Sequence, residues 1–177
     1  MTTLATDRLH IRPFAMEDAE VLHAFWANPE VRRYLWDDQV LPLDTVRAII
    51  ERSVRDFAEH GWGFFSLDLK ATEPVIVGFC GFRHFQRGEE DGEDIELLYG
   101  ILPEYWGEGF VTEAALAVLR HGFDACGMRR VIASTDTPNQ RAVRVLQRLG
   151  MSFEERRVWR GLDTVFYAIT ADEFAER

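Results

Sequence analysis

The chain has 177 residues, of which 47% are hydrophobic, and this is enough to build one domain with a sizeable core. Its formal net charge of −10 argues against nucleic acid as the main partner, because phosphate binding needs a basic field. The same acidic charge is compatible with a cationic substrate such as an amine.

No apolar run in the sequence approaches the ~20 residues of a membrane-spanning helix, and the first residues lack the features of a signal peptide. We therefore expect a cytoplasmic protein without membrane contact. The cysteines, Cys80 and Cys126, form no C-x-x-C motif and are expected to be reduced thiols. The histidines include no H-x-x-x-H pair, so the sequence predicts no metal site.

Hydrophobic periodicity and turn residues predict an alternation of strands and helices. In chain order they indicate a strand at Leu9–Phe14, helices at Met16–Trp26, Val31–Leu35 (one turn) and Leu43–Glu59, strands at Gly63–Leu69, Val75–Arg83 and Asp94–Leu102, a helix at Gly109–Ala125, a strand at Arg130–Thr135, a helix at Asn139–Leu149, and a hairpin of Ser152–Arg160 and Leu162–Thr170. This order predicts an α/β fold with a mixed, mostly antiparallel sheet of about seven strands and helices on both faces. No segment resembles a linker, so residues 1–177 are expected to form a single domain.

The connection between the strand Asp94–Leu102 and the next helix contains two glycines, Gly107 and Gly109. The first N–H groups of a helix lack intrahelical partners, and the helix dipole adds partial positive charge there. Glycines let a bulky anion approach the backbone, so this turn is a candidate phosphate cradle. Taken alone, it is equally compatible with a glycine-rich connection that binds nothing. It lacks both the G-K-[ST] of a P-loop and a complete G-x-G-x-x-G fingerprint.

The residues around the turn resemble those of a known family. Tyr105–Ala114 is similar to the acetyl-CoA signature of the GNAT superfamily, in particular to its ribosomal-protein N-terminal acetyltransferase (RimJ/RimL-type) branch. Further motifs of that branch follow in the same order over nearly the whole chain, at Thr6–Pro13, Asn28–Val31, Val77–Phe82, Glu96–Tyr99 and Asn139–Met151.

The resemblance implies the GNAT fold, in which the fourth and fifth strands splay apart and admit the pantetheine arm of acetyl-CoA. It implies main-chain hydrogen bonds to that arm from Ile101 and Leu102. It also assigns the pyrophosphate to Gly107, Glu108, Gly109, Phe110, Val111 and Thr112. Asn139 would bind near the pantetheine or the thioester. Arg148 is either a ligand of a cofactor phosphate or a solvated helix charge.

Glu104 departs from the family pattern, which has Gln or Arg at its position, and an acidic group near a pyrophosphate is unfavourable. We therefore assign Glu104 no binding role. The family's usual tyrosine and serine on the last long helix are replaced here by Leu146 and Ala142. The proton donor to the CoA thiolate is thus open: the substrate ammonium, water, Tyr99 or Thr135 are all candidates.

The resemblance implies direct transfer of an acetyl group to a primary amine in a ternary complex, which requires a proton acceptor. Glu96 is the candidate base, because this branch commonly carries a glutamate there and apolar sequence neighbours would desolvate it. The alternative is a structural strand carboxylate. Tyr34, Trp36 and Asp37 are candidates for the acceptor pocket, since aromatic walls and carboxylates suit a cationic amine. The alternative is that the two aromatic residues belong to the core and that Asp37 lies in a solvated acidic turn.

Acetyl-CoA and an amine acceptor are therefore the expected partners, with no metal and no nucleic acid. A protein N-terminus, a polyamine and an antibiotic all remain open as acceptors, and so do a monomer and a homodimer. A second class of function, a non-catalytic module that binds CoA for sensing or interaction, is favoured by the missing tyrosine and serine. The intact turn, Asn139 and Glu96 favour the enzyme.

Overall fold

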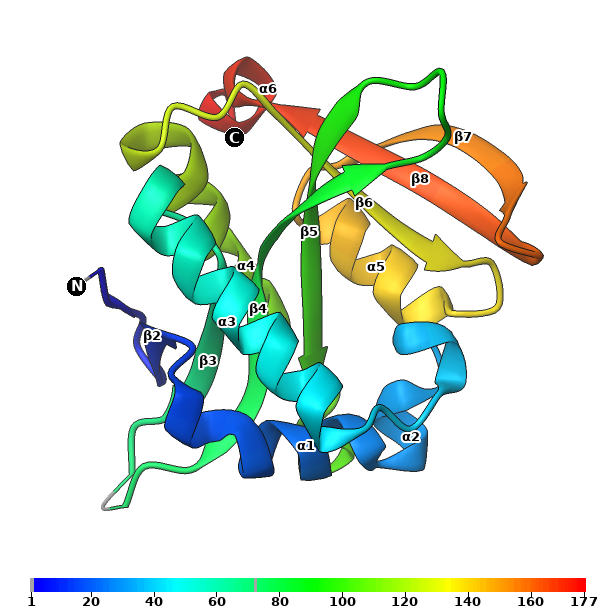
Figure 1. Ribbon diagram of the computed structural model, residues 1–177. Helices are drawn as coiled ribbons and strands as arrows, with labels where there is room; N and C mark the ends of the chain where they lie inside the picture. The colour runs from blue at the N-terminus through cyan, green and yellow to red at the C-terminus, as the bar shows by residue number, and fades with distance from the viewer. Residues whose placement is uncertain (1, 72) are drawn as a thin grey trace.

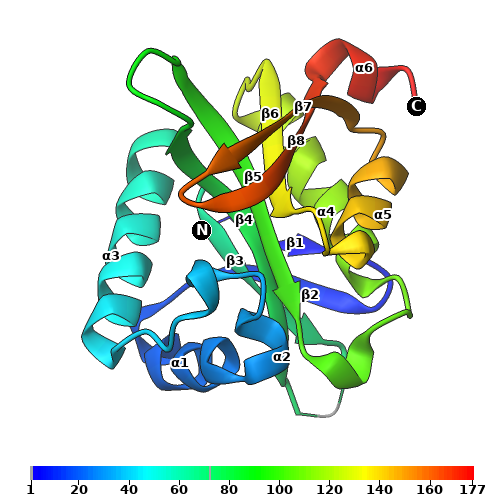
Figure 2. The same ribbon diagram turned by 90° about the vertical axis from the view of Figure 1, so that its right-hand side faces the viewer.

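The computed structural model describes residues 2–71 and 73–177, and one sheet of eight strands runs through it in the order β1-β2-β3-β4-β5-β6-β8-β7 (Figures 1 and 2). The strands are β1 (Leu4–Ala5), β2 (Leu9–Pro13), β3 (Phe64–Leu69), β4 (Ile76–Gln86), β5 (Glu93–Ile101), β6 (Arg130–Asp136), β7 (Ser152–Trp159) and β8 (Leu162–Thr170). The β5–β6 pairing is parallel and the neighbouring pairings are antiparallel. This confirms the mixed, mostly antiparallel sheet.

Helices cover both faces of the sheet, as predicted. They are α1 (Ala19–Ala27), α2 (Pro29–Arg32), α3 (Leu43–His60), α4 (Phe110–Arg120), α5 (Gln140–Arg148) and α6 (Ala171–Ala175). In Figure 2, α1 and α3 lie on one side of the central strands, and α4 and α5 lie on the other. Among the described residues, no helix is both long and apolar enough to cross a membrane.

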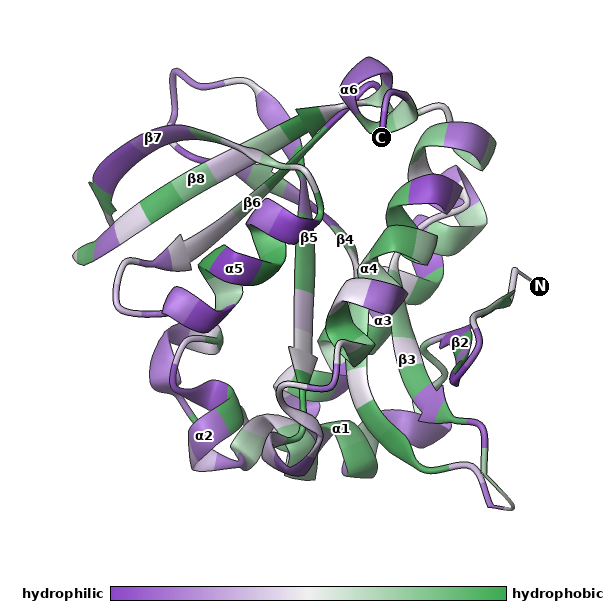
Figure 3. Ribbon diagram, turned by 180° about the vertical axis from the view of Figure 1, so that it is seen from behind, coloured by the Kyte–Doolittle hydropathy of each residue, from purple (hydrophilic) through white to green (hydrophobic). Residues whose placement is uncertain are grey.

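The core has a layer on each side of β4, because successive side chains of a strand point to opposite faces. Phe79 packs with α1, where its ring centroid lies 5.4 Å from that of Trp26. Its neighbour Cys80 belongs to the cluster under α4. Both side chains are 0% exposed. Figure 3 shows mainly hydrophobic residues along β3 and β4 beneath α4.

Two short elements were not predicted. β1 has two residues, Leu4–Ala5, which are too few to produce a recognisable alternation. α6 begins with a capping box, in which Thr170 and Glu173 bind each other's backbone N–H groups. The T-x-x-E spacing is a helix-start signal in the sequence, so α6 was predictable.

The predicted helix Gly109–Ala125 is regular only as far as Arg120 and ends in a π-helical turn, His121–Ala125. The predicted turn Val31–Leu35 is also displaced. The helix starts earlier, at Pro29, because Asn28 accepts a hydrogen bond from the backbone N–H of Glu30 as its N-cap. Both shifts affect element ends and leave the order unchanged.

Candidate active site

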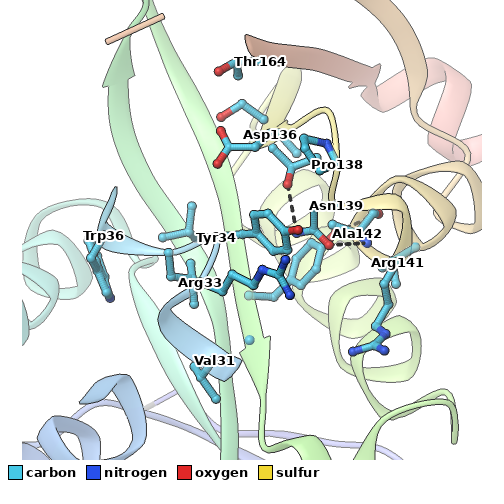
Figure 4. A pocket seen from close by; sticks show the side chains of 18 of the residues that line it. Val31, Arg33, Tyr34, Trp36, Asp136, Pro138, Asn139, Arg141, Ala142 and Thr164 are labelled. Carbon is cyan, nitrogen blue, oxygen red and sulfur yellow. Dashed lines mark hydrogen bonds between the residues drawn. The ribbon is translucent and has the colours of Figure 1, made fainter. Parts of the chain in front are cut away.

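Strands β5 and β6 separate soon after they meet. In the described residues their pairing joins Glu96 to Ile132 alone, whereas on its other side β6 pairs with β8 from Arg130 to Asp136. The separation opens a cleft of about 930 Å³, lined by β5, β6, the start of α5 and the segment from α2 to Asp38 (Figure 4). The predicted splay of the fourth and fifth strands is therefore confirmed as the splay of β5 and β6.

Glu96 lies where the two strands separate, and it is 0% exposed. Its Oε2 accepts a hydrogen bond of 2.7 Å from Arg83 Nε on β4, and its Oε1 accepts one of 2.6 Å from Ser134 Oγ on β6. Apolar surroundings were expected for Glu96. This expectation is wrong for its carboxylate, because a guanidinium and a hydroxyl contact the two oxygens. Each oxygen can accept a further hydrogen bond. Glu96 lines the cleft, so such a bond can come from a group inside it.

The glycine turn presents a run of main-chain donors. Within the part of the chain that the structure describes, no hydrogen bond uses the N–H groups from Gly107 to Thr112. The first bond of α4 runs from Glu113 N to Gly109 O. Gly107 and Gly109 both have left-handed backbones, with φ of 79° and 80°. This conformation followed by a helix start aims successive N–H groups at one point, which suits an anion.

Acidic side chains of the turn do not fill this donor run. Glu104 and Glu108 are both exposed. Glu108 faces solvent as a middle residue of such a turn is expected to do, so its contribution to an anion site is its N–H group. Thr112 is partly buried on the first turn of α4, where its N–H completes the run.

A clamp from the N-terminal segment holds the turn in place. Arg8 Nη1 donates to the carbonyl of Glu108 at 3.0 Å, and Arg8 Nη2 lies 2.6 Å from Glu113 Oε2. The guanidinium also lies 4.0 Å from the centre of the Phe110 ring. Thr6 Oγ1 donates to Glu113 Oε1 at 2.5 Å. Burial raises the pKa of Glu113, but the hydrogen bonds from Thr6 and Arg8 outweigh it and leave that pKa below its ordinary value.

Main-chain groups of β5 alternate between β4 and the cleft. Leu102 N donates to Val77 O at 2.8 Å, and Leu102 O accepts from Tyr105 N at 3.0 Å. Antiparallel pairs alternate, so Tyr99 and Ile101 direct their N–H and C=O groups away from β4, toward the gap. The expectation for Ile101 is compatible with this geometry for its N–H group, whereas its carbonyl already accepts a hydrogen bond from Trp106 Nε1 at 3.1 Å. The expectation for Leu102 is not, because both its main-chain groups already have partners.

Asn139 is the N-cap of α5 and lies in the cleft wall (Figure 4). Its Oδ1 accepts from Ala142 N at 3.3 Å, and its Nδ2 donates to Thr135 Oγ1 at 3.0 Å. These bonds orient the amide and position the start of α5. One hydrogen of Nδ2 and one lone pair of Oδ1 remain for a ligand.

The positive charge beside the cleft comes from residues that the sequence did not single out. Arg141 and Arg144 line the cleft, whereas Arg148 lies outside its lining. The Arg141 guanidinium lies 3.7 Å from the centre of the Trp106 ring, next to the glycine turn. Arg148 is exposed and its carbonyl accepts a hydrogen bond from Arg177. The structure therefore favours Arg141 over Arg148 near a cofactor phosphate.

The predicted acceptor residues Tyr34, Trp36 and Asp37 all line the cleft, together with Asp136 from the end of β6. In Figure 4, Trp36 lies across the cleft from Arg141, and Asp136 lies beside Pro138. Burial raises the pKa of Asp136 above its ordinary value, and the nearby carboxylates of Asp37 and Asp163 raise it further. Asp136 was not among the candidates. No sequence motif contains Asp136, and it reaches the cleft only because β6 lies next to β5 in the sheet.

Trp36, Asp37 and Asp38 form a left-handed turn, with φ of 52°, 54° and 57°. L-residues avoid this region at a cost of roughly 1–2 kcal/mol each, and such strain is concentrated at functional sites. Backbone bonds from Asp38 N to Leu35 O and from Gln39 N to Trp36 O close the turn. The turn brings the Trp36 ring against Trp26, with centroids 5.2 Å apart, and leaves Asp37 beside the cleft.

Tyr99 lies deep in the cleft, and its hydroxyl donates to the carbonyl of Ala142 at 3.2 Å. Burial raises the pKa of Tyr99 far above its ordinary value, and the proximity of Cys80 adds to the shift. A phenol in this state donates a hydrogen bond but gives up its proton reluctantly. Tyr99 is therefore a poor choice among the predicted thiolate acids.

A family model and similar proteins all indicate the same family. The acetyltransferase (GNAT) domain family matches residues 8–152. The uncharacterized N-acetyltransferase p20 of Bacillus licheniformis is 30% identical over 99% of this chain and 99% of its own. The spermidine N(1)-acetyltransferase of Escherichia coli K12 is 24% identical over 81% of this chain and 73% of its own.

Among solved structures, the ribosomal L7/L12 alpha-N-protein acetyltransferase RimL, in complex with coenzyme A, superposes with a TM-score of 0.79. The two chains are 16% identical, and the match covers 97% of this chain and 99% of RimL. At this identity the likeness is one of fold.

Proposed function

The chain belongs to the GNAT acetyltransferase family, and from that premise we propose that this N-acetyltransferase moves the acetyl group of acetyl-CoA to a cationic primary amine. One observation carries the proposal. A single cleft has unpaired main-chain donors and Arg141 near one side, carboxylates on the other, and Glu96 at the point where the strands separate. The first feature suits a pyrophosphate, and the second suits an ammonium group.

The residues near the turn fit the cofactor. The N–H groups from Gly107 to Thr112 would hold the pyrophosphate, with Arg141 adding positive charge. The main-chain groups of Tyr99 and the N–H group of Ile101 would offer hydrogen bonds to the pantetheine arm, in the manner of an added strand. Asn139 would bind close to the thioester. When bound, acetyl-CoA supplies an acyl group activated as a thioester.

The chain's own residues then have to manage the amine and its protons. An ammonium group binds between Asp37 and Asp136 and must lose a proton before its nitrogen lone pair can attack the thioester carbonyl. Glu96, within the cleft lining, accepts this proton directly or through a water molecule. Arg83 stabilises the carboxylate before transfer and holds it in place.

The amine nitrogen would gain a bond to the acetyl carbon as the C–S bond breaks, and it would then carry one surplus proton. That proton would pass to the departing CoA sulfur, which balances the reaction without a dedicated acid. This route is favoured because Leu146 and Ala142 have no proton to donate and Tyr99 holds its own proton tightly.

The acidic acceptor side favours a polycationic amine over a neutral one, with a spermidine-like polyamine as the substrate class. A protein N-terminus is the second candidate, because RimL shares the fold and the sequence motifs resemble the RimJ/RimL-type branch. We further propose that residues 1–177 are one acetyltransferase domain, located in the cytoplasm.

The test is acetyl-CoA-dependent release of CoA thiol with a panel of polyamines, aminoglycosides and short peptides. Wild type should turn over at least one amine, and Glu96→Gln should lower kcat by about 10²–10⁴-fold, the usual contribution of a general base. Ser134→Ala is the matched control, since it removes a hydrogen bond to Glu96 and keeps the carboxylate. Its kcat should fall far less.

Two results separate this proposal from its alternative. Cofactor binding without turnover of any amine would favour a non-catalytic CoA-binding module. If Glu96→Gln still turns over amines at the wild-type rate, the protein is an enzyme but Glu96 is not its base. Glu96 would then only link β4, β5 and β6 through its hydrogen bonds. The melting temperature of each variant shows whether a loss of activity is a loss of fold.

A further inference from the structure

Three potential metal ligands from two distant segments meet at the end of α3. Asp56 and His60 are four residues apart on α3 and so share one helix face, and His84 lies on β4. One ligand atom from each of the three lies within 4.8 Å of the other two. The cluster is separate from the acetyl-transfer cleft, whose lining in the described residues includes none of them.

A neighbouring carboxylate orients His84. Its Nδ1 lies 2.5 Å from Oε1 of Glu93 on β5. A carboxylate at one ring nitrogen fixes the tautomer and leaves the lone pair on the other nitrogen, and metal-bound histidines almost always have such a partner. Nε2 of His84 is therefore the nitrogen available for a metal.

Packing restricts both imidazoles. The His60 ring stacks on the Trp62 ring, with centroids 5.4 Å apart and an angle of 19° between the planes. The His84 ring lies 4.8 Å from the same indole. Trp62 is 5% exposed, so this central ring is fixed in the core. Rings held this way lose little rotational freedom when they bind an ion.

Asp56 completes the set from the buried side, with 4% exposure. Arg52 Nε contacts its Oδ1 at 3.0 Å, and the Arg52 side chain is 59% exposed. Water screens the exposed Arg52 end of this pair, so Arg52 is a weak competitor for the carboxylate. The second oxygen, Oδ2, faces no such partner among the described residues.

We propose that Asp56, His60 and His84 bind a divalent transition-metal ion of the Zn²⁺ class, with Glu93 orienting His84. Two imidazoles and one carboxylate suit Zn²⁺, whereas Mg²⁺ and Ca²⁺ prefer sites built from oxygen alone. The ion would tie the last turn of α3 to the part of β4 that extends beyond β3, whose pairing ends at Gly81. The sequence did not predict the site because His84 is remote from the D-x-x-x-H pair on α3.

The test is calorimetric titration of Zn²⁺ into tag-free protein that has been freed of metal with a chelator. Wild type should bind one equivalent. His60→Ala and His84→Ala should each weaken binding at least tenfold, and Glu93→Gln by about tenfold, as expected for an outer partner. Zn²⁺ should raise the melting temperature of wild type, and Mg²⁺ at the same concentration should not.

Two control variants locate the ion. His10→Ala removes an exposed histidine on β2, and Cys126→Ser removes the thiol that lies 3.3 Å from His121 Nε2. Both should bind Zn²⁺ like wild type. Absence of binding by wild type, loss of binding in Cys126→Ser, or unchanged binding in His60→Ala would each overturn the proposal. His60 is exposed, so its replacement keeps the test valid even if the His84 variant fails to fold.

Discussion

Asp136 is the residue whose electrostatics say most about the acceptor. It stands at the end of β6 in the cleft wall, and the carboxylates of Asp37 and Asp163 lie near enough to raise its pKa in addition to the effect of burial. Carboxylates that repel each other in this way are stabilised by a bound cation. The amine that the proposed reaction requires is such a cation.

Asp136→Asn should raise KM for a cationic amine about fivefold, the equivalent of ~1 kcal/mol for a partly exposed charge contact. The affinity for acetyl-CoA should not change, because in the described residues Asp136 forms no hydrogen bond with the glycine turn. Steady-state kinetics and calorimetry measure the two quantities separately. An unchanged KM, or a loss of cofactor affinity, would contradict the role assigned to Asp136.

The same substitution has a pH-dependent effect on stability. The folded-state pKa of Asp136 is raised, so its contribution to stability is present below the ordinary value of 3.8 and is lost as pH rises through the folded-state pKa. At neutral pH the charged side chain therefore destabilises the fold. The asparagine variant should melt at a higher temperature than wild type at pH 7, and this difference should shrink on acidification.

Single residues were predictable where a motif contained them and not where the fold assembled their partners. Glu96 and Asn139 were found through the order of motifs, and both line the cleft. Arg83 was not found as the partner of Glu96, because only the antiparallel register of β4 and β5 sets the two residues opposite each other. The sequence predicted Arg148 as the phosphate ligand and not Arg141. The direction of each side chain depends on how α5 packs against Trp106, which the sequence does not show.

At the scale of elements, the glycine turn depends on the clamp by Arg8. Arg8→Ala should weaken acetyl-CoA binding about three- to fivefold, or ~0.7–1 kcal/mol, since the ion pair with Glu113 is partly exposed. The kcat at saturating cofactor should remain close to wild type. Arg47→Ala is the control, because Arg47 forms an exposed pair with Asp44 on α3. A fall in kcat with unchanged cofactor affinity would refute the clamp.

The left-handed turn Trp36–Asp38 shows where element prediction fails. None of its residues is glycine, and three successive residues with positive φ are outside what local propensity can predict. Tertiary contacts, such as the packing of Trp36 on Trp26, stabilise the turn against its backbone strain. Trp36 and Asp37 were predicted because an aromatic wall and a carboxylate suit a cationic amine. The left-handed turn that places them at the cleft was not predictable from the sequence.

For the whole molecule, hydrophobic periodicity predicted the order of elements, because each kind of regular element has its own period, and the resemblance to the GNAT superfamily implied the splayed sheet. Pairings such as that between Thr6 and Glu113 were not predictable, since they join residues far apart in the sequence. The Asp56, His60 and His84 cluster belongs to the same class. Contacts between residues far apart in the sequence were therefore not predictable at either the acetyl-transfer cleft or the proposed metal site.

Ligand linkage gives a prediction for the whole molecule. Acetyl-CoA at about 100 times its Kd should stabilise the fold by ~2.7 kcal/mol. For a chain of 177 residues this corresponds to a rise in Tm of about 5–10 °C. A thermal scan with and without acetyl-CoA measures it. An unchanged Tm at millimolar acetyl-CoA would mean that the turn is a glycine-rich connection without a ligand.

The most direct test of the account is calorimetry of acetyl-CoA with wild type, Gly109→Val and Gly127→Val. Valine is strained at both positions, where φ is 80° and 67°, but Gly127 is remote from the donor run of the turn. A Cβ at Gly109 has room, its nearest neighbour being Arg8 Nη2 at 3.7 Å, so strain rather than a clash would misalign the N–H groups. We predict affinity at least tenfold weaker in Gly109→Val and unchanged in Gly127→Val. Equal affinity in all three proteins would contradict the placement of the cofactor at this turn.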